Sequence, residues 1–120
     1  MFGLSKETKL DFLVGCELQQ IAFSRFQLIL RLSRGIEVSI ESRLELKSAD
    51  NRVALVWEPE AFSDLPGIAT LIGASITTNE IPGDGRLVLC FDNEAVLTIH
   101  DSNTGHESYQ ITGGGQTVVV

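Results

Sequence analysis

One segment of this chain occurs twice, and the repeat constrains the fold more than any single residue does. Leu-Val-Gly-Cys-Glu-Leu at 13–18 is matched by Leu-Ile-Gly-Ala-Ser-Ile at 71–76, an offset of 58 (71 minus 13). An alternating apolar series follows each copy at an offset of 59: Leu28, Leu30, Leu32, Val38 and Ile40 are matched by Leu87, Leu89, Phe91, Leu97 and Ile99. Two copies of one pattern predict two similar units that pack with approximate two-fold symmetry.

The length and composition are those of one domain. A chain of 120 residues, 43% hydrophobic and 21% charged, fits a single globular core. We therefore expect one domain over residues 1–120, with internal repeats at about 5–57 and 63–120. The two cysteines form no disulfide framework, and the N-terminus has no signal-peptide pattern. No apolar run approaches the ~18 residues of a membrane span. These features predict a cytoplasmic protein that does not associate with membranes.

Each copy begins with signals for a short helix. Ser5 precedes residues 6–13 and Gly15 follows them, while Ser63 precedes residues 64–71 and Gly73 follows them. Serine caps the first turn of a helix, and glycine suits a left-handed end. A short helix is therefore predicted in each copy, followed by strands at 17–23 and 75–81.

Two β-hairpins follow, and their register can be derived from the alternation. Leu30 should lie opposite Val38, which places Arg31 opposite Glu37 on the outer face and leaves 33–35 as a three-residue loop. Gly35 then occupies the loop position that needs a positive φ. In the second hairpin the loop is 92–94, with Glu94 in the position of Gly35. A non-glycine residue costs about 1 kcal/mol in that conformation, unless this loop is a different turn.

The predicted fold class is α+β and mainly antiparallel β. Further strands are expected at 53–57, 108–111 and 116–120, the last two around Gly113-Gly114-Gly115. The valine run at 118–120 would pair within a sheet or at a homodimer interface. The chain would thus form two pseudo-symmetric helix-plus-hairpin units, arranged as a partly open barrel or as a two-layer sandwich.

Charge is distributed unevenly along the chain. Residues 1–52 contain eight basic and seven acidic side chains, whereas residues 53–120 contain nine acidic side chains and one basic side chain, Arg86. The sum, +1 and −8, is the net charge of −7. An acidic surface repels nucleic acid and anionic lipid, and it attracts a basic protein.

The residues that could support catalysis do not occur in a recognisable pattern. His100-Asp101 and His106-Glu107 match no common metal-ligand spacing, so we expect no metal site. Cys16 and Cys90 are expected to be packing thiols. The chain has no Gly-x-Ser-x-Gly motif, and its triple glycine lacks the lysine of a phosphate-binding loop. We expect no catalytic residue and no cofactor.

The candidate partner-binding residues are acidic side chains of the second half and two aromatic side chains. They are Glu80, Asp84, Asp92, Glu94, Trp57 and Tyr109. Aromatic residues often anchor protein interfaces, but as core or edge aromatics these two need no such role.

The whole pattern resembles a bacterial family of small proteins of uncharacterised function. The resemblance rests on Leu-x-Gly-x-x-apolar in both copies, on the two hairpins, and on His-Glu-Ser-Tyr-Gln-Ile at 106–111 before the glycines. The family tends to have glycine at the position of Glu94 and tyrosine at the position of His106. Some similar domains are encoded near toxin loci, which implies an immunity role but no catalytic residue.

Two functions therefore remain open. The first is a non-enzymatic binding protein that neutralises a basic protein through its acidic second half, in the immunity role that the resemblance implies. The alternative is a small-molecule binding module with its ligand between the two repeats.

Overall fold

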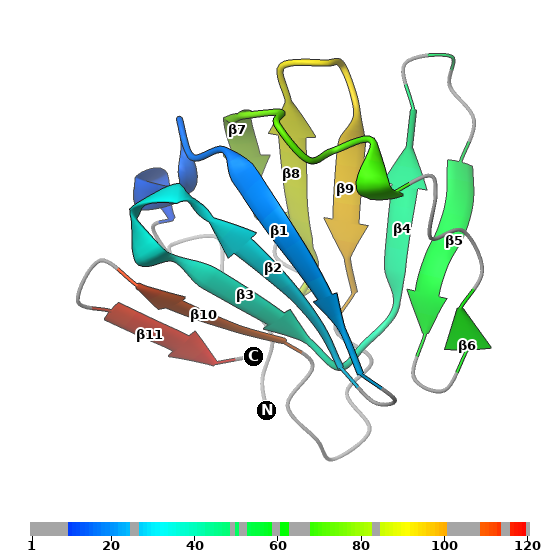
Figure 1. Cartoon of the computed structure of the whole chain (residues 1–120), viewed down its shortest axis with the longest axis horizontal. Helices are drawn as coiled ribbons and strands as arrows, with labels where there is room; N and C mark the ends of the chain where they lie inside the picture. The colour runs from blue at the N-terminus through cyan, green and yellow to red at the C-terminus, as the bar shows by residue number, and fades with distance from the viewer. Residues whose placement is uncertain are drawn as a thin grey trace.

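Two antiparallel sheets face each other across one hydrophobic core (Figure 1). The computed structural model describes residues 10–24, 27–48, 50, 53–58, 61–62, 68–82, 85–100, 109–113 and 116–119. The strands of the first sheet, in spatial order, are β1 (Leu18–Phe23), β2 (Leu28–Leu32), β3 (Glu37–Ile40), β10 (Tyr109–Gly113) and β11 (Gln116–Val119). Those of the second sheet are β6 (Ala61–Phe62), β5 (Val53–Glu58), β4 (Leu44–Lys47), β9 (Val96–Ile99), β8 (Leu87–Phe91) and β7 (Ile76–Glu80).

The two halves of the chain exchange strands. β1, β2 and β3 pair in sequence order, but the next strand of their sheet is β10, from the end of the chain. In the same way, β7, β8 and β9 are followed by β4 from the first half. Each sheet therefore obtains its fourth strand from the other half, and neither half contains a complete sheet of its own.

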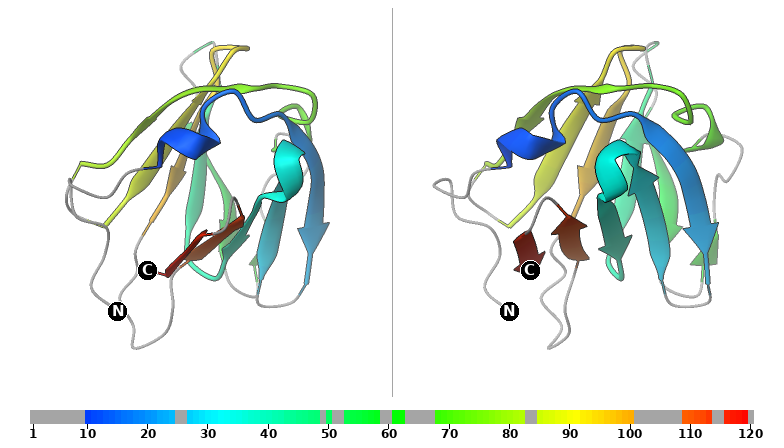
Figure 2. Two further views of the ribbon diagram at one scale, coloured as in Figure 1. Left: turned by 90° about the vertical axis from the view of Figure 1, so that its left-hand side faces the viewer. Right: turned by 60° about the vertical axis from the view of Figure 1, so that its left-hand side comes forward.

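The repeated segments 15–18 and 73–76 cross each other above the core (Figure 2). Glu17 and Ser75, which are equivalent at the offset of 58, form an antiparallel bridge with each other. The backbone hydrogen bonds around this bridge come in reciprocal pairs: Gly15 N to Ile76 O at 2.7 Å and Gly73 N to Leu18 O at 2.8 Å, then Leu18 N to Ala74 O and Ile76 N to Cys16 O, both at 2.9 Å. A local two-fold axis thus passes close to the Glu17–Ser75 bridge.

The core is built from the inward positions of both hairpins. Their equivalent residues are at most 3% exposed: Leu28, Leu30 and Leu32 in β2, and Leu87, Leu89 and Phe91 in β8. Burying each such side chain contributes roughly 1.5–3 kcal/mol. Tyr109 closes the core at one end, because its ring is buried and its hydroxyl donates a hydrogen bond to the carbonyl of Gly85 at 2.8 Å.

The predicted hairpin registers are confirmed. Leu30 pairs with Val38 and Arg31 with Glu37, while Leu89 pairs with Leu97. Gly35 has a φ of 72° and Glu94 a φ of 69°, so both occupy the left-handed conformation expected for the loops. The first loop contains a second left-handed residue that the sequence did not indicate, Arg34 with a φ of 66°.

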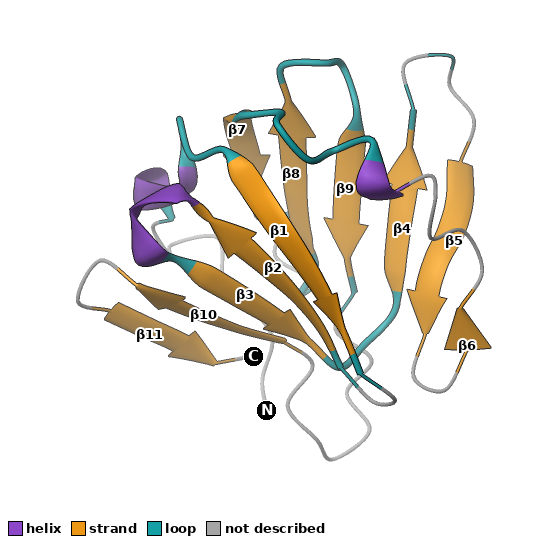
Figure 3. Cartoon of the chain, in the orientation of Figure 1, coloured by secondary structure: helices purple, strands orange, loops and turns teal. Residues whose placement is uncertain are grey.

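The predicted α+β class and the helix-plus-hairpin description of the repeat are wrong, because the described residues form mostly antiparallel β structure. The described helical residues are a 3-10 turn, η1 (Asp11–Leu13), the 3-10 loop η2 (Ser33–Gly35), and residues 68–69 (Figure 3). Residues 5–9 and 63–67, where the predicted helices begin, lie outside the described residues. η1 has no side-chain cap, and Val14 is already extended, because Gly15 joins the crossing segment. A segment this short lacks the length to stabilise a helix by itself.

The partly open barrel is also not what forms, because the described strands make two separate sheets. The predicted strands at 17–23, 75–81, 53–57 and 108–111 correspond to β1, β7, β5 and β10. Val118 and Val119 of the valine run fall in β11. β11 pairs with β10 inside the chain and forms the edge of the first sheet.

Candidate functional site

The outer faces of the two sheets carry different side chains at equivalent positions, and this difference bears on where a partner could bind. Antiparallel pairing places Arg31 opposite Glu37 in the first sheet and Cys90 opposite Val96 in the second. These two pairs are equivalent at the offset of 59 residues. Both lie on outward positions, since the buried residues alternate with them along each strand. Equivalent places on the two faces therefore carry different chemistry.

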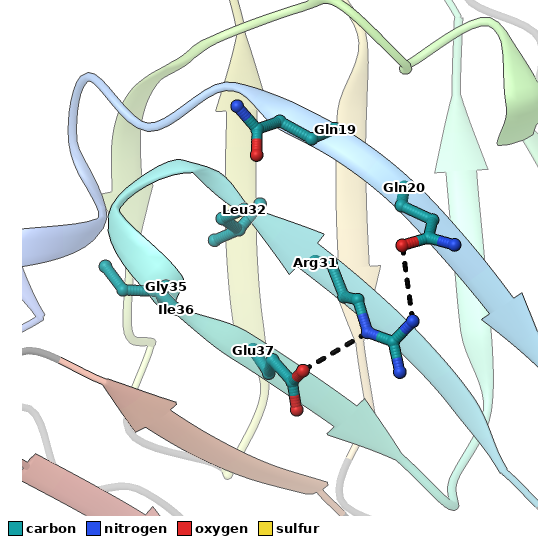
Figure 4. A pocket seen from close by; sticks show the side chains of 7 residues that line it. All are labelled: Gln19, Gln20, Arg31, Leu32, Gly35, Ile36 and Glu37. Carbon is teal, nitrogen blue, oxygen red and sulfur yellow. Dashed lines mark hydrogen bonds and ion pairs between the residues drawn. The ribbon is translucent and has the colours of Figure 1, made fainter.

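At the position of Arg31 and Glu37, the outer face of the first sheet is polar and balanced in charge. Arg31 Nε donates to Glu37 Oε1 at 3.2 Å, and Arg31 Nη1 donates to Gln20 Oε1 at 3.2 Å (Figure 4). These groups border a shallow hollow of about 230 Å³, lined by Gln19, Gln20, Arg31, Leu32, Gly35, Ile36 and Glu37. Both charged side chains are close to half exposed, so the ion pair is screened by water. The hollow contains no nucleophile, and its arginine is already paired.

The outer face of the second sheet has an apolar centre. Cys90 pairs with Val96, and the neighbouring row pairs Val88 with Thr98. All four side chains are half-buried. On the edge strand β7, Thr78 pairs with Cys90 and Glu80 with Val88. We call the surface formed by these six residues the second-sheet face: Thr78, Glu80, Val88, Cys90, Val96 and Thr98.

Carboxylates lie at the margin of the second-sheet face. Glu80 is adjacent to Val88, and Asp92 and Glu94 lie in the loop that joins β8 to β9. All three are exposed, and none has a cationic partner among the described residues. Asp92 also fixes the crossing segment, because its Oδ1 accepts a hydrogen bond from Ser75 N at 3.2 Å.

On the side toward β4 the charges are mixed. Glu45 Oε1 lies 3.3 Å from Arg43 Nη2 and 3.0 Å from His100 Nε2. Lys47 pairs with Val96 in register and is exposed. The acidic margin of the second-sheet face is therefore on β7 and at the β8–β9 loop, and the opposite margin carries both charges.

The structure separates the residues that the sequence grouped as a partner-binding site. Glu80 lies opposite Val88, whereas Asp92 and Glu94 follow the far end of β8, so they border the face at different places. Asp84 lies outside the described residues. Trp57 is in β5, paired with Phe62 in backbone register, and its side chain is outside the described part of the chain.

The assignment of Tyr109 to the partner-binding site needs correction. Its side chain is 1% exposed and its hydroxyl is bonded to the Gly85 carbonyl. In this structure it has no surface to offer a partner. The alternation of Tyr109 with Ile111, both buried, places it on the inward side of β10.

The histidine and cysteine residues form no metal-binding cluster in the described part of the chain. Within the described residues, no group of three or more His, Cys, Asp or Glu side chains is arranged to hold a metal ion. His106 lies outside the described residues. Cys16 is buried, with its thiol 3.4 Å from the carbonyl of Phe12, and Cys90 is half-buried; both are free thiols.

A small ligand between the two halves would have to displace packed side chains. Leu30, Val38, Leu89 and Leu97 face the space between the sheets, and each is 0% exposed. A hollow that described residues do form lies on the outside of the first sheet.

The sequence interpretation missed Val88, Cys90 and Val96 as a surface. A signal for it was present in the repeat. The inward positions of the two copies are similar, whereas the outward positions change from Arg31 and Glu37 to Cys90 and Val96. A comparison of the outward positions alone would have identified this face.

Fold and surface together define an antiparallel β protein with two sheets, exchanged central strands, and one outer face that has an apolar centre and an acidic margin. The chain belongs to a family of unknown function (DUF6188), whose model matches residues 10–120. No curated protein and no solved structure matches the chain. Among the described helical segments, none has the length and apolar character needed to cross a membrane.

Proposed function

We propose that this protein is a non-enzymatic binding protein that recognises a basic protein partner through the acidic side chains of its second half. The observation that carries the proposal is the excess of acid in the second half, with nine acidic side chains against one basic side chain in residues 53–120. Among these acids, Glu80, Asp92 and Glu94 are exposed and have no cationic partner among the described residues.

Unpaired surface carboxylates affect association more than they affect folding. They add little stability to the free protein, but their field accelerates encounter with a basic protein. Because this attraction acts over a Debye length of about 8 Å at physiological ionic strength, it weakens as salt is added. Nine acidic side chains against one basic side chain in residues 53–120 supply such a field.

The resemblance to domains encoded near toxin loci favours a more specific form of this function. The protein would act as an immunity protein in the bacterial cytoplasm, where it would cover the basic surface of a toxin. An inhibitor of this kind needs complementary charge and shape but no catalytic group.

The proposal can be tested by capture and then by kinetics. The immobilised protein is exposed to a lysate of its source organism, and retained proteins are identified by mass spectrometry. The captured protein is then produced separately, and its association rate is measured by surface plasmon resonance at low and physiological salt. We expect a basic partner and an association rate that falls as salt rises. An acidic partner, or a rate insensitive to salt, contradicts the proposal.

Matched charge variants sharpen this experiment. The double variant Glu80→Gln/Glu94→Gln removes two exposed carboxylates from the second half, and Asp11→Asn/Glu41→Gln removes two from the first half. We expect the first variant to slow association several-fold and the second to have a smaller effect. Asp92 is better tested by Asp92→Asn, because asparagine keeps an acceptor for Ser75 N.

A further inference from the structure

We infer that the partner docks on the second-sheet face, with aliphatic side chains over Val88, Cys90 and Val96 and with cationic side chains toward Glu80, Asp92 and Glu94. The occupant is a basic protein segment whose apolar residues lie between its lysines or arginines. This inference rests on the proposed function and adds to it the surface and the chemical pattern of the partner.

The apolar centre is the first reason. Cys90 and Val96 are opposite each other, and Val88 lies in the adjacent row, so three half-buried apolar side chains adjoin on one face. At the equivalent place in the first sheet, the ion pair of Arg31 and Glu37 covers the surface with charge. Interfaces concentrate binding energy in an apolar centre from which water is excluded.

The position of the carboxylates is the second reason. Glu80, on β7, adjoins Val88. In the loop that joins β8 to β9, Asp92 follows Cys90 by two residues and Glu94 precedes Val96 by two residues. Lys47, an exposed cation, lies beyond Val96 on the neighbouring strand β4. A bound segment would therefore direct its cations toward β7 and the β8–β9 loop.

The same charges argue against a second copy of this chain as the occupant. Two copies packed face to face would bring their unpaired carboxylates toward each other, and like charges across an interface are unfavourable. Exposed aliphatic residues elsewhere in the described structure are poorer candidates for the apolar centre of an interface. Val14 and Ile72 are 41% and 49% exposed, but they lie on two separate turns at opposite ends of the crossing segments.

Cys90 provides an intrinsic probe for the test. It is half-buried, whereas Cys16, the other cysteine of the chain, is 0% exposed. The alkylation rate of Cys90 by N-ethylmaleimide can therefore be followed by intact-mass spectrometry. Two peptides of equal length and charge serve as probes: one alternates lysine with leucine, the other lysine with serine. Their binding is measured separately by fluorescence anisotropy.

We expect the lysine–leucine peptide to bind more tightly and to slow Cys90 alkylation several-fold, and the lysine–serine peptide to protect less. The matched control is Cys90→Ser/Arg31→Cys, which moves the thiol to the equivalent position of the first sheet. That thiol should keep its alkylation rate when the peptide is added. Glu80→Gln/Glu94→Gln should weaken both binding and protection.

The outcomes separate the two proposals. If the lysine–leucine peptide binds but leaves Cys90 alkylation unchanged, or protects position 31 equally, the inferred docking face is wrong while recognition of basic segments stands. If neither peptide binds at low salt, both the docking face and the proposed function are contradicted.

Discussion

The two halves of this molecule have similar inward residues, and they differ in chemistry at one pair of outward positions. Leu30 and Leu89 occupy equivalent buried positions, and both are 0% exposed. One residue further along each strand, Arg31 stands in the first sheet where Cys90 stands in the second. The inward positions must fill one shared core, so they tolerate little change. The outward positions are free to differ, and the comparison indicates that the second sheet carries the recognition surface.

The two hairpin loops also differ in detail. Both close with equivalent backbone hydrogen bonds, Leu32 N to Ile36 O at 2.8 Å and Phe91 N to Ala95 O at 2.9 Å. The first loop has two left-handed residues, Arg34 and Gly35, and the second has Glu94 alone. Equivalent loops are therefore built from different conformations.

The largest expected effect tests whether the halves form one cooperative unit. Leu30→Ala and Leu89→Ala should each destabilise the protein by about 2–5 kcal/mol, because each leaves a cavity in the shared core. Since the sheets exchange β4 and β10, both variants should unfold in a single transition in urea, followed by circular dichroism. Two separate transitions, with only one of them shifted in each variant, would mean that the halves are independent.

Substitution of the loop glycine, Gly35, and of its equivalent, Glu94, should change stability in opposite directions. Gly35→Ala should destabilise by about 1 kcal/mol, because alanine resists positive φ. A Cβ at Gly35 would meet no atom within 4 Å, so conformational strain is the only cost. Glu94→Gly should be neutral or stabilising by up to about 1 kcal/mol. The midpoints of urea unfolding decide both, and a clear loss of stability in Glu94→Gly would contradict the equivalence.

The turns next to the crossing segments offer a smaller test. Ser33 Oγ accepts a hydrogen bond from Glu17 N at 3.0 Å, and Asp92 Oδ1 accepts the equivalent bond from Ser75 N at 3.2 Å. Ser33→Ala and Asp92→Ala should each cost about 0.5–1.5 kcal/mol. Asp92→Asn is the control, because it removes the charge and retains an acceptor. If only one of the two alanine variants lost stability, the two turns would be equivalent in geometry but not in their contribution to stability.

The hairpins could be predicted because alternation with a period of two is a local property of the sequence. Leu30 opposite Val38 follows directly from that period and the length of the loop. The exchange of β4 and β10 could not be predicted in this way, because strands far apart in sequence leave no local signal of their pairing. The helices were predicted wrongly because Ser5 and Ser63 indicate where a helix could begin, but not whether a few residues suffice to stabilise one.

The surface was only partly predictable for a similar reason. The excess of acid in residues 53–120 is visible in the composition, and Glu80, Asp92 and Glu94 are exposed. Which strands adjoin, and hence which apolar residues those carboxylates border, depends on long-range pairing. Tyr109 was misassigned because an aromatic residue in a strand has the same local pattern on an inward and on an outward face.

The smallest expected effect on stability gives the sharpest test of the comparison. The double variant Cys90→Arg/Val96→Glu would transfer the ion pair of the first sheet to the second. An exposed ion pair adds about 0–1 kcal/mol to the free energy of unfolding, whereas the loss of apolar contacts lowers it. Because the two changes oppose each other, the urea midpoint should move little. The reverse transfer, Arg31→Cys/Glu37→Val, should also leave the midpoint nearly unchanged.

Binding of the lysine–leucine peptide, measured by anisotropy, should nevertheless fall several-fold in the first variant, because charge would cover the apolar centre. It should not fall in the second variant, which leaves the second-sheet face intact. Equal binding by both variants would show that the difference between the two outer faces has no part in recognition.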